Sequence, residues 1–395
     1  MKDATRAGTL GRRPHAHAGT INPPVYHAAT ILAPSFEEYT RRRGVRYGDE
    51  VTYGVHGTPG TYAFEEAIAA LEGGHRTRLC STGLQALAAG FLCCLRAGDH
   101  VLLTDSCYGP VRSIASGILA RMGVESTYYD PHLGGEIRTL FRPNTRMVLV
   151  EAPGSWTFEM QDIPAIAEEA KKAGILVMMD NTWASPLYCK PFTLGVDISV
   201  QAITKYVGGH SDLVMGTVTA TQPVYDEHIQ PGWYQMGLSG SPDDVYLAMR
   251  GLRSLPVRMQ AHWQAGLKMG EWLLGREEIV EVIHPAMPHD PGHALWKRDF
   301  LGAASLFAFV IDPRYGSDAH MSALLDHLEH YGMGASWGGF ESLLIPTYPE
   351  RIRSATRWPA PGRPKGQCMR IHVGLEDTDD LIADLAAGLD RMRRV

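Results

Sequence analysis

Long hydrophobic runs and a positive charge excess are both missing from this sequence. No stretch of about 18 uncharged apolar residues occurs, so a membrane-spanning helix is not expected. The 37 basic residues face 43 acidic ones, and the formal net charge is −6. Because phosphate groups and anionic lipids attract basic surfaces, the charge balance argues against a nucleic-acid or membrane-surface binder. A small-molecule partner is expected instead.

Cysteine is scarce, and it shows no metal-type spacing. The six cysteines include no CxxC pair, and the 17 histidines include no HExxH pattern. No metal site is therefore expected, and the cysteines are interpreted as reduced, mostly buried thiols. The first residues carry charges and histidines and have no apolar core of the signal-peptide type, so a cytoplasmic location is expected.

What is present is an ordinary globular composition, with 45% hydrophobic and 20% charged residues. Three regions differ in texture. Residues 1–60 are rich in Gly, Pro, Arg and Tyr and have little periodicity, which predicts an extended arm that contacts a neighbouring subunit. Residues 61–245 predict a large α/β domain that binds the cofactor discussed below. Residues 246–395 predict a smaller C-terminal α+β domain with a long helical region at its start.

Short apolar runs alternate with helical patterns through the large domain. Strands that are apolar throughout are typical of a mainly parallel sheet covered on both faces. Helical spacing of apolar residues, ended by glycines, separates the runs. The runs lie at residues 101–103, 147–150, 175–179, 198–200 and 214–218.

Asp180 and Lys205 each follow one of these predicted strands. Open α/β sheets bind ligands at the carboxyl ends of their strands. Taken alone, Asp180 is also compatible with a turn or a helix cap, and Lys205 with a surface lysine. Together they suggest a carboxylate and an amine that hold the two ends of one flat heterocycle, because an apolar setting favours the uncharged amine that a Schiff base requires.

Several further motifs, in one order along the chain, resemble the Cys/Met-metabolism family of enzymes that use pyridoxal 5′-phosphate (PLP). Within that family the bacterial cystathionine β-lyases are most similar. The resemblance implies the PLP-dependent transferase fold of type I, the aspartate-aminotransferase-like fold, with a mainly parallel seven-stranded sheet. The motifs are DNTWA at 180–184, QAITKYVGGHSD at 201–212, RGLRSL at 250–255, WKRDF at 296–300, SWGGFESL at 336–343 and RIHVGLED at 370–377.

The resemblance also implies roles for individual residues. Lys205 matches the lysine that carries the cofactor aldehyde and moves the Cα proton, and Asp180 matches the partner of the pyridine nitrogen. Tyr108 matches the tyrosine that stacks on the ring and accepts a proton from the incoming amine. The remaining matches are Thr82, Gly83, Leu84 and Thr204 for the phosphate, with Ser336, Trp337 and Arg370 for the substrate α-carboxylate.

Residues 52–58 match a family loop that reaches into the neighbouring subunit's site, and they depart from it in part. Tyr53 is kept as a residue for the phosphate and the substrate. Val55 stands where the family has an arginine on the phosphate, and His56 stands where β-lyases often carry a second arginine. These changes make a smaller or less acidic S-substituted cysteine an alternative to cystathionine.

The activity implied is β-cleavage of cystathionine, or of a related S-substituted cysteine, to a thiol, pyruvate and ammonia. Such a reaction belongs to trans-sulfuration and methionine biosynthesis. Ala202 favours it, because γ-acting relatives usually carry Ser at that position. A γ-lyase or γ-replacement enzyme is the nearest alternative, and a non-catalytic PLP-fold binding protein is a remote one. The family suggests a homotetramer, built as a dimer of dimers with shared active sites.

Overall fold

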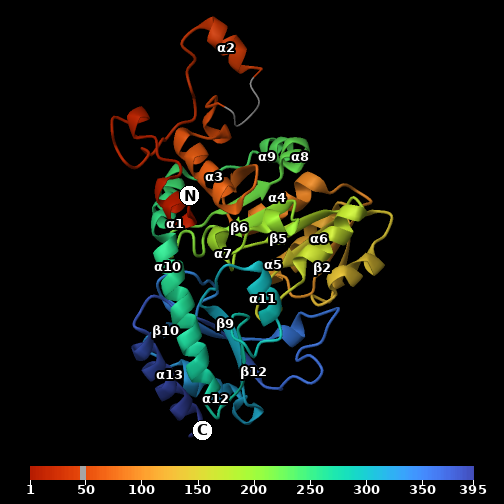
Figure 1. Cartoon of the computed structure of the whole chain (residues 1–395), viewed down its shortest axis with the longest axis vertical. Helices are drawn as coiled ribbons and strands as arrows, with labels where there is room; N and C mark the ends of the chain where they lie inside the picture. Colours follow the sequence, from red (N-terminus) through yellow and green to blue (C-terminus); the bar gives the residue numbers. More distant parts are fainter. Residues whose placement is uncertain (45–49) are drawn as a thin grey trace.

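A seven-stranded sheet forms the centre of the larger part of the molecule (Figure 1). The computed structural model describes residues 1–44 and 50–395. The strand order is β1-β7-β6-β5-β4-β2-β3, and β7 runs antiparallel to both of its neighbours while the other pairs are parallel. The strands are β1 (Arg76–Cys80), β2 (His100–Thr104), β3 (Glu125–Tyr129), β4 (Thr145–Glu151), β5 (Leu176–Asp180), β6 (Ile198–Ala202) and β7 (Gly216–Ala220).

The apolar strands bury both of their faces. Leu149 and Met178 belong to a cluster on one face, which also holds buried residues of α4, α5 and α9. Val150 and Met179 belong to the cluster on the opposite face, together with α3 and α6. Successive residues of a strand point to opposite faces, so an uninterrupted apolar run fills both layers. The helices are α3 (Pro59–Glu72), α4 (Gly83–Cys94), α5 (Gly109–Ile114), α6 (Ile163–Lys172), α7 (Ser185–Tyr188), α8 (Gln222–Val224) and α9 (Gln230–Gln235).

A long helix, α10 (Pro242–Leu274), runs from the large sheet down to a second, smaller sheet (Figure 1). The smaller sheet has five strands in the order β10-β11-β12-β9-β8. Its strands are β8 (Ile279–Ile283), β9 (Leu306–Ile311), β10 (Tyr331–Gly332), β11 (Ser342–Thr347) and β12 (Gln367–His372). The helices of this part are α11 (His293–Asp299), α12 (Asp318–Leu325) and α13 (Thr378–Met392).

The predicted fold class is confirmed by this arrangement and by the fold relatives given below. The predicted division at residues 60 and 245 remains a prediction, and α10 spans the second of these positions. Strand β9 coincides with an uninterrupted apolar run at residues 306–311. No helix in the described ranges is long and apolar enough to cross a membrane.

The N-terminal segment lies along the outside of the large sheet domain and extends away from it (Figure 1). It contains α1 (Asp3–Thr9) and α2 (Phe36–Arg42). Large apolar side chains of this arm face solvent in the single chain, and Leu32 and Phe36 are each 83% exposed. Exposed apolar surface of this kind is typical of an interaction site.

Five of the chain segments that leave the large sheet at one edge lead into the site. Strands β2, β4, β5 and β6 are parallel to one another, and β1 points the same way because β7 is antiparallel to both β1 and β6. Their carboxyl ends therefore lie side by side. Ligands of open α/β sheets bind at this edge, and the residues that follow these strands form the site described next.

Candidate active site

A cavity of about 230 Å³ opens at the carboxyl edge of the large sheet. Its lining residues from the large domain lie in or after strands β1, β2, β4, β5 and β6. Leu306, Trp337 and Arg370 come from the smaller domain. Nine of the predicted site residues line it: Thr82, Gly83, Leu84, Tyr108, Asp180, Thr204, Lys205, Trp337 and Arg370. The pocket is therefore formed between the two sheets, as many ligand sites are.

The turn before α4 presents a helix N-terminus to the cavity. The Gln85 side chain accepts from the backbone N–H of Ser81 at 2.8 Å, and the Thr82 hydroxyl accepts from the backbone N–H of Gln85 at 2.9 Å. This reciprocal capping fixes the turn. The backbone N–H groups of Gly83 and Leu84 then lie in the first turn, where no intrahelical acceptor exists, and they favour an anion.

Asp180 ends β5 and lies in a short hydrogen-bonded turn. Its carboxylate accepts from the Thr182 backbone N–H at 3.0 Å and from the Thr182 hydroxyl at 2.6 Å. The same hydroxyl accepts from the backbone N–H of Ala202 at 2.9 Å, which ties β5 to β6. Burial raises the pKa of Asp180, while the bonds from Thr182 and the charge of Lys205 act in the opposite direction.

Lys205 lies in the turn after β6, which ends three residues earlier at Ala202. Its amine donates to the Ser336 hydroxyl at 2.6 Å and lies 5.3 Å from the ring centre of Trp337. Burial, and secondarily the charge of Arg370, lower the pKa of Lys205 to about 8. An amine with such a pKa is partly uncharged near neutral pH, as a nucleophilic lysine must be.

Arg370 lies in β12 and is buried. Its Nη2 donates to the carbonyl oxygens of Gly334, Ala335 and Ser336 at 3.2, 3.1 and 3.1 Å. Burial lowers the pKa of Arg370 to about 10. A guanidinium carries five N–H donors, so the groups not used in these bonds remain for a carboxylate in the cavity.

The loop that carries Ser336 and Trp337 packs tightly on Lys205. Gly338 has a φ of 85°, and a Cβ there would lie 3.0 Å from Cα of Lys205. The backbone N–H of Gly338 donates to Nε2 of His372 at 3.1 Å. Nδ1 of His372 lies 3.3 Å from the Ser305 hydroxyl, and its Nε2 lies 3.1 Å from the carbonyl oxygen of Gly339. Glycine is required where another backbone approaches so closely.

Thr204 and Tyr53 were predicted to bind the cofactor phosphate, and in the single chain they have other surroundings. The Thr204 hydroxyl accepts from the backbone N–H of Met215 at 3.0 Å and donates to its carbonyl at 3.2 Å. Tyr53 is 48% exposed and does not line the cavity of its own chain. His56 is buried, and its ring lies 4.9 Å from that of Tyr234. Ser336 reaches the site through its bond to Lys205.

Glu151 is a pocket residue that the sequence interpretation missed. It ends β4, and its register partner on β5 is Asp180. Its Oε2 accepts from the backbone N–H of Tyr108 at 2.7 Å. A signal for it existed, because a carboxylate directly follows the apolar run at 147–150, as Asp180 follows the run at 175–179.

The segment after Glu151 forms an aromatic wall that was also missed. Trp156 and Phe158 line the cavity, and both have positive φ, 68° and 52°. Non-glycine residues rarely adopt such φ values, and where they do the surrounding structure holds them. Sequence patterns carry little signal for these positions, because the segment belongs to no helix or strand.

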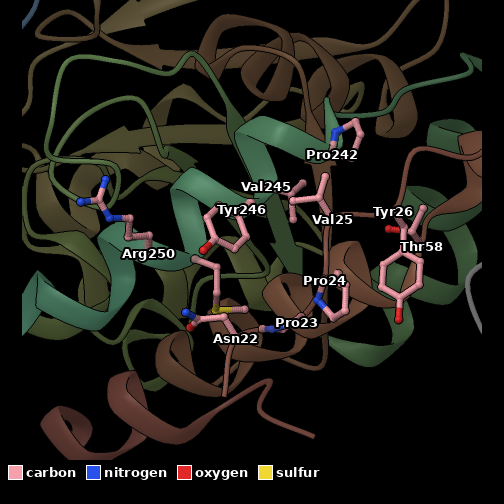
Figure 2. A pocket seen from close by; sticks show the side chains of 12 residues that line it. Asn22, Pro23, Pro24, Val25, Tyr26, Thr58, Pro242, Val245, Tyr246 and Arg250 are labelled. Carbon is pink, nitrogen blue, oxygen red and sulfur yellow. The ribbon is translucent and has the colours of Figure 1, made fainter. Parts of the chain in front are cut away.

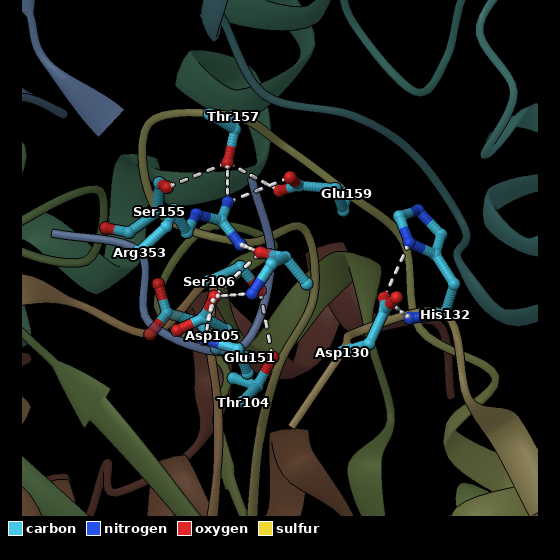
Figure 3. A network of polar contacts seen from close by, with 12 residues as sticks. Thr104, Asp105, Ser106, Asp130, His132, Glu151, Ser155, Thr157, Glu159 and Arg353 are labelled. Carbon is cyan, nitrogen blue, oxygen red and sulfur yellow. Dashed lines mark hydrogen bonds and ion pairs between the residues drawn. The ribbon is translucent and has the colours of Figure 1, made fainter. Parts of the chain in front are cut away.

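A network of polar contacts joins this wall to the smaller domain (Figure 3). Arg353 donates to Oε1 of Glu159 at 2.8 Å and also to the Thr157 hydroxyl. Asp105, which follows β2, accepts from the backbone N–H of Thr356 at 2.8 Å and from Arg112 at 2.5 Å. Although burial opposes it, hydrogen bonding led by the Thr356 hydroxyl lowers the pKa of Asp105 to about 2.

A second, smaller hollow of about 30 Å³ lies between the arm and the first turns of α10 (Figure 2). Pro23, Pro24, Val245 and Tyr246 form part of its wall. Arg250 is its one charged lining residue in the described part of the chain. The described lining of this hollow holds no acid, amine or thiol for chemistry.

The residues of the cavity at the sheet edge fit PLP. The α4 N-terminus suits the phosphate, Asp180 suits the ring nitrogen, and Lys205 suits the aldehyde. The phosphate cradle also requires its glycines. A Cβ on Gly83 would lie 2.6 Å from Cβ of Ala202, and a Cβ on Gly216 would lie 2.4 Å from the carbonyl oxygen of Thr82.

Comparisons with known proteins agree with this donor set. Residues 4–390 match the family described as Cys/Met metabolism PLP-dependent enzyme. A protein of Rhizobium johnstonii named putative cystathionine beta-lyase is 46% identical over 386 residues, which cover 97% of this chain and 95% of that protein. The cystathionine beta-lyase of Salmonella typhimurium is 38% identical, with 98% of each chain covered.

Solved structures give the same fold. The crystal structure of cystathionine gamma synthase from Xanthomonas oryzae pv. oryzae, in complex with aminoacrylate and cysteine, superposes with a TM-score of 0.90 and 28% sequence identity. That alignment covers 100% of this chain and 99% of the other.

Proposed function

Because the chain belongs to the Cys/Met metabolism family of PLP-dependent enzymes, we propose that it cleaves the Cβ–S bond of cystathionine. Cystathionine and water would give homocysteine, pyruvate and ammonia. The observation that carries this proposal is the meeting of Lys205, Asp180 and Arg370 in one cavity. The chain is a PLP-dependent carbon–sulfur lyase by its family and its relatives, and the predicted family, fold class, cofactor and enzyme class are confirmed.

The proposed roles follow the geometry of the cavity. The backbone N–H groups at Gly83 and Leu84, with the Thr82 turn, would hold the cofactor phosphate. Asp180 would pair with the ring nitrogen, and Tyr108 would stack on the ring. The Thr204 role at the phosphate has less support, because its hydroxyl is already bonded to Met215 on both sides.

The substrate would enter as an α-amino acid, with its carboxylate on Arg370 and beside Ser336 and Trp337. When bound, PLP supplies an electron-accepting ring conjugated to the substrate amine. Nζ of Lys205 would remove the proton from Cα. The Cβ–S bond would then break, and the sulfur would leave with the bonding electrons as a thiolate. The remaining three-carbon fragment would hydrolyse to pyruvate and ammonia.

Tyr108 is the proposed proton acceptor for the incoming amine. Burial and the charge of Asp180 raise the pKa of Tyr108, so the hydroxyl is protonated in the free enzyme. To accept the proton of the amine, the hydroxyl of Tyr108 would first have to release its own proton to solvent. The ring itself is 42% exposed within the chain, which leaves one face open to the cavity.

A γ-cleaving enzyme of the same family is the alternative, and a single experiment distinguishes γ-cleavage from β-cleavage. Purified holoenzyme is incubated with cystathionine, and the keto acid is identified by chromatography. Pyruvate with homocysteine supports β-cleavage. 2-Oxobutyrate with cysteine contradicts it and supports γ-cleavage. The matched control is Lys205→Ala, which should release neither.

A smaller or less acidic S-substituted cysteine is a second candidate substrate. The wall of the cavity is aromatic, with Trp156, Phe158 and Trp183. Lys205 and Arg370 are its cationic lining residues in the described part of the chain, and the proposed roles use both of them. A second α-carboxylate, such as the distal one of cystathionine, would therefore need a partner subunit. A screen of cystathionine, cystine, cysteine and S-alkylcysteines for keto-acid release ranks these substrates.

We also propose a homotetramer, built as a dimer of dimers with shared sites, and a cytoplasmic location. The exposed apolar side chains of the arm and the exposed Tyr53 support subunit contact. All six cysteines are free thiols, which suits a reducing compartment. An amino-acid substrate is the partner that the family implies.

A further inference from the structure

Two carboxyl groups lie side by side in the floor of the cavity, and the roles above use one of them. Glu151 and Asp180 end neighbouring parallel strands and are register partners. Both line the same cavity. The second carboxyl lies beside the one that would pair with the cofactor nitrogen. Two neighbouring like charges destabilise each other, so the presence of Glu151 requires an explanation.

The contacts of Glu151 lead to Tyr108. Its Oε2 accepts from the Tyr108 backbone N–H at 2.7 Å, and the Ser155 side chain lies near this carboxyl. The backbone N–H of Ser155 donates to the carbonyl of Ser106 at 2.7 Å. The carboxyl therefore ties the segment before α5 to the wall after β4, and Figure 3 shows Glu151, Ser106 and Ser155 close together.

The carbonyl of Tyr108 also accepts from the backbone N–H of Val111 at 2.9 Å. Tyr108 precedes α5 as the N-cap residue and makes no side-chain cap. The residue is 42% exposed, and it lines the cavity. An aromatic ring that must lie parallel to a ligand needs a fixed backbone, since errors of about 1 Å in placement reduce catalysis strongly.

We propose that Glu151 is a positioning residue, which holds the ring of Tyr108 over the cofactor through the backbone N–H of Tyr108. This inference rests on the proposed function. Glu151 would touch neither substrate nor the reacting atoms, and it would act through Tyr108 alone.

The electrostatics of the site suit this role. Burial, and then the charge of Asp180, raise the pKa of Glu151 well above that of an ordinary carboxyl group. The other titratable groups that face it are Arg353, Cys107 and Tyr108. A raised pKa favours the protonated form of Glu151, which can accept the bond from Tyr108 without adding a second negative charge beside Asp180.

The test compares Glu151→Gln and Glu151→Ala as PLP-loaded proteins, with Glu159→Gln as the matched control. Glu159 is also a carboxyl of the segment after β4, with its side chain 8% exposed, but it pairs with Arg353 and does not line the cavity. Three quantities are measured: the circular dichroism of the cofactor band, the pH midpoint of cofactor absorbance, and kcat with KM.

E151A should weaken the cofactor dichroism and lower kcat about tenfold, with little change in KM, because the ring is no longer held. E151Q should keep the dichroism, keep the pH midpoint, and lose less of kcat than E151A. E159Q should leave the cofactor dichroism and its pH midpoint unchanged.

Two results would overturn the inference. One is an E151A protein whose dichroism and kcat match those of E159Q. The other is an E151Q protein whose pH midpoint moves by about one unit or more, since this would show that a charge had been removed. If E151A does not fold, the E151Q midpoint decides alone. Failure of the wild type to release keto acid would contradict the proposed reaction, whereas the dichroism and pH readouts would still report on Glu151.

Discussion

The amine of Lys205 and the hydroxyl of Ser336 lie 2.6 Å apart, and this hydrogen bond crosses from the large sheet domain to the smaller one. Ser336 belongs to the loop whose carbonyls accept from Arg370. The amine that would carry the cofactor and the guanidinium that would bind the substrate are thus linked through one loop. Each prediction below perturbs one part of this arrangement.

Cofactor capture by the apoprotein should follow the titration of Lys205. Its pKa is lowered to about 8 by burial, so the uncharged amine becomes more abundant as the pH rises through 8. Between pH 7 and pH 9 the rate of PLP capture should rise about tenfold and level off, as a group of that pKa requires. Stopped-flow absorbance measures this rate. A rise of about a hundredfold without levelling would indicate a lysine of ordinary pKa and contradict the shift.

The charge of Asp180 acts on the same titration. Because that charge raises the pKa of Lys205, Asp180→Asn should move the midpoint of cofactor capture to lower pH. Solvent that entered the pocket would instead raise the midpoint, because it would stabilise the charged amine of Lys205. The two effects therefore have opposite signs. Stopped-flow capture curves of the variant and the wild type at matched ionic strength decide between the two signs.

Removal of Arg370 should weaken substrate binding. Arg370→Ala takes away the buried guanidinium proposed for the α-carboxylate, and truncating one partner of such a pair costs about 2–5 kcal/mol. A rise in KM of about thirtyfold or more is expected. Arg314→Ala is the matched control, because Arg314 is exposed and pairs with Asp312 outside the cavity. Equal KM values for the two variants would exclude Arg370 as the carboxylate site.

The contact between the domains at Arg353 should matter for stability. Arg353 and Glu159 form an ion pair whose side chains are 3% and 8% exposed. Arg353→Ala leaves a buried carboxylate without its cation, which costs about 3–5 kcal/mol. Calorimetry should show a clear fall in Tm. Arg351→Ala, two residues away and largely exposed, should leave Tm unchanged, and a similar fall in both variants would refute a specific role for the pair.

Shared active sites predict that two inactive variants restore activity when mixed. Lys205→Ala lacks the amine, and Tyr53→Ala lacks the residue proposed to reach the partner's site. After subunit exchange, half of the dimers would be hybrids, and each hybrid would contain one intact site. About a quarter of wild-type activity should return. Activity that stays at the level of the unmixed variants would mean that each chain completes its own site.

Some of this site was predictable because its signal is local. The apolar runs before Asp180 and after 198 mark buried strands, and a polar residue at the end of such a strand faces the ligand edge. Lys205 still lies in a turn beyond β6 rather than in the strand, because β6 ends at Ala202. Strand β1 was not predicted, because it contains the charged residues Arg76 and Arg78. Arg78 is buried in the structure, where it forms an ion pair with Glu65.

The rest depends on contacts between distant segments. The Arg353 contacts join residues about 190–200 positions apart, and no spacing rule connects such residues. The positive φ values of Trp156 and Phe158 have no sequence signature in residues that are not glycine. The predicted reach of Tyr53 concerns a second chain, so it stays a prediction.

The most direct test of the central claim is to find the lysine that carries PLP. The purified protein is loaded with PLP and reduced with borohydride, and its peptides are sequenced by mass spectrometry. The cofactor should be recovered on the peptide that contains Lys205, and Lys205→Ala should carry none there. Recovery on another lysine of the wild type, or no labelled peptide at all, would contradict the assignment.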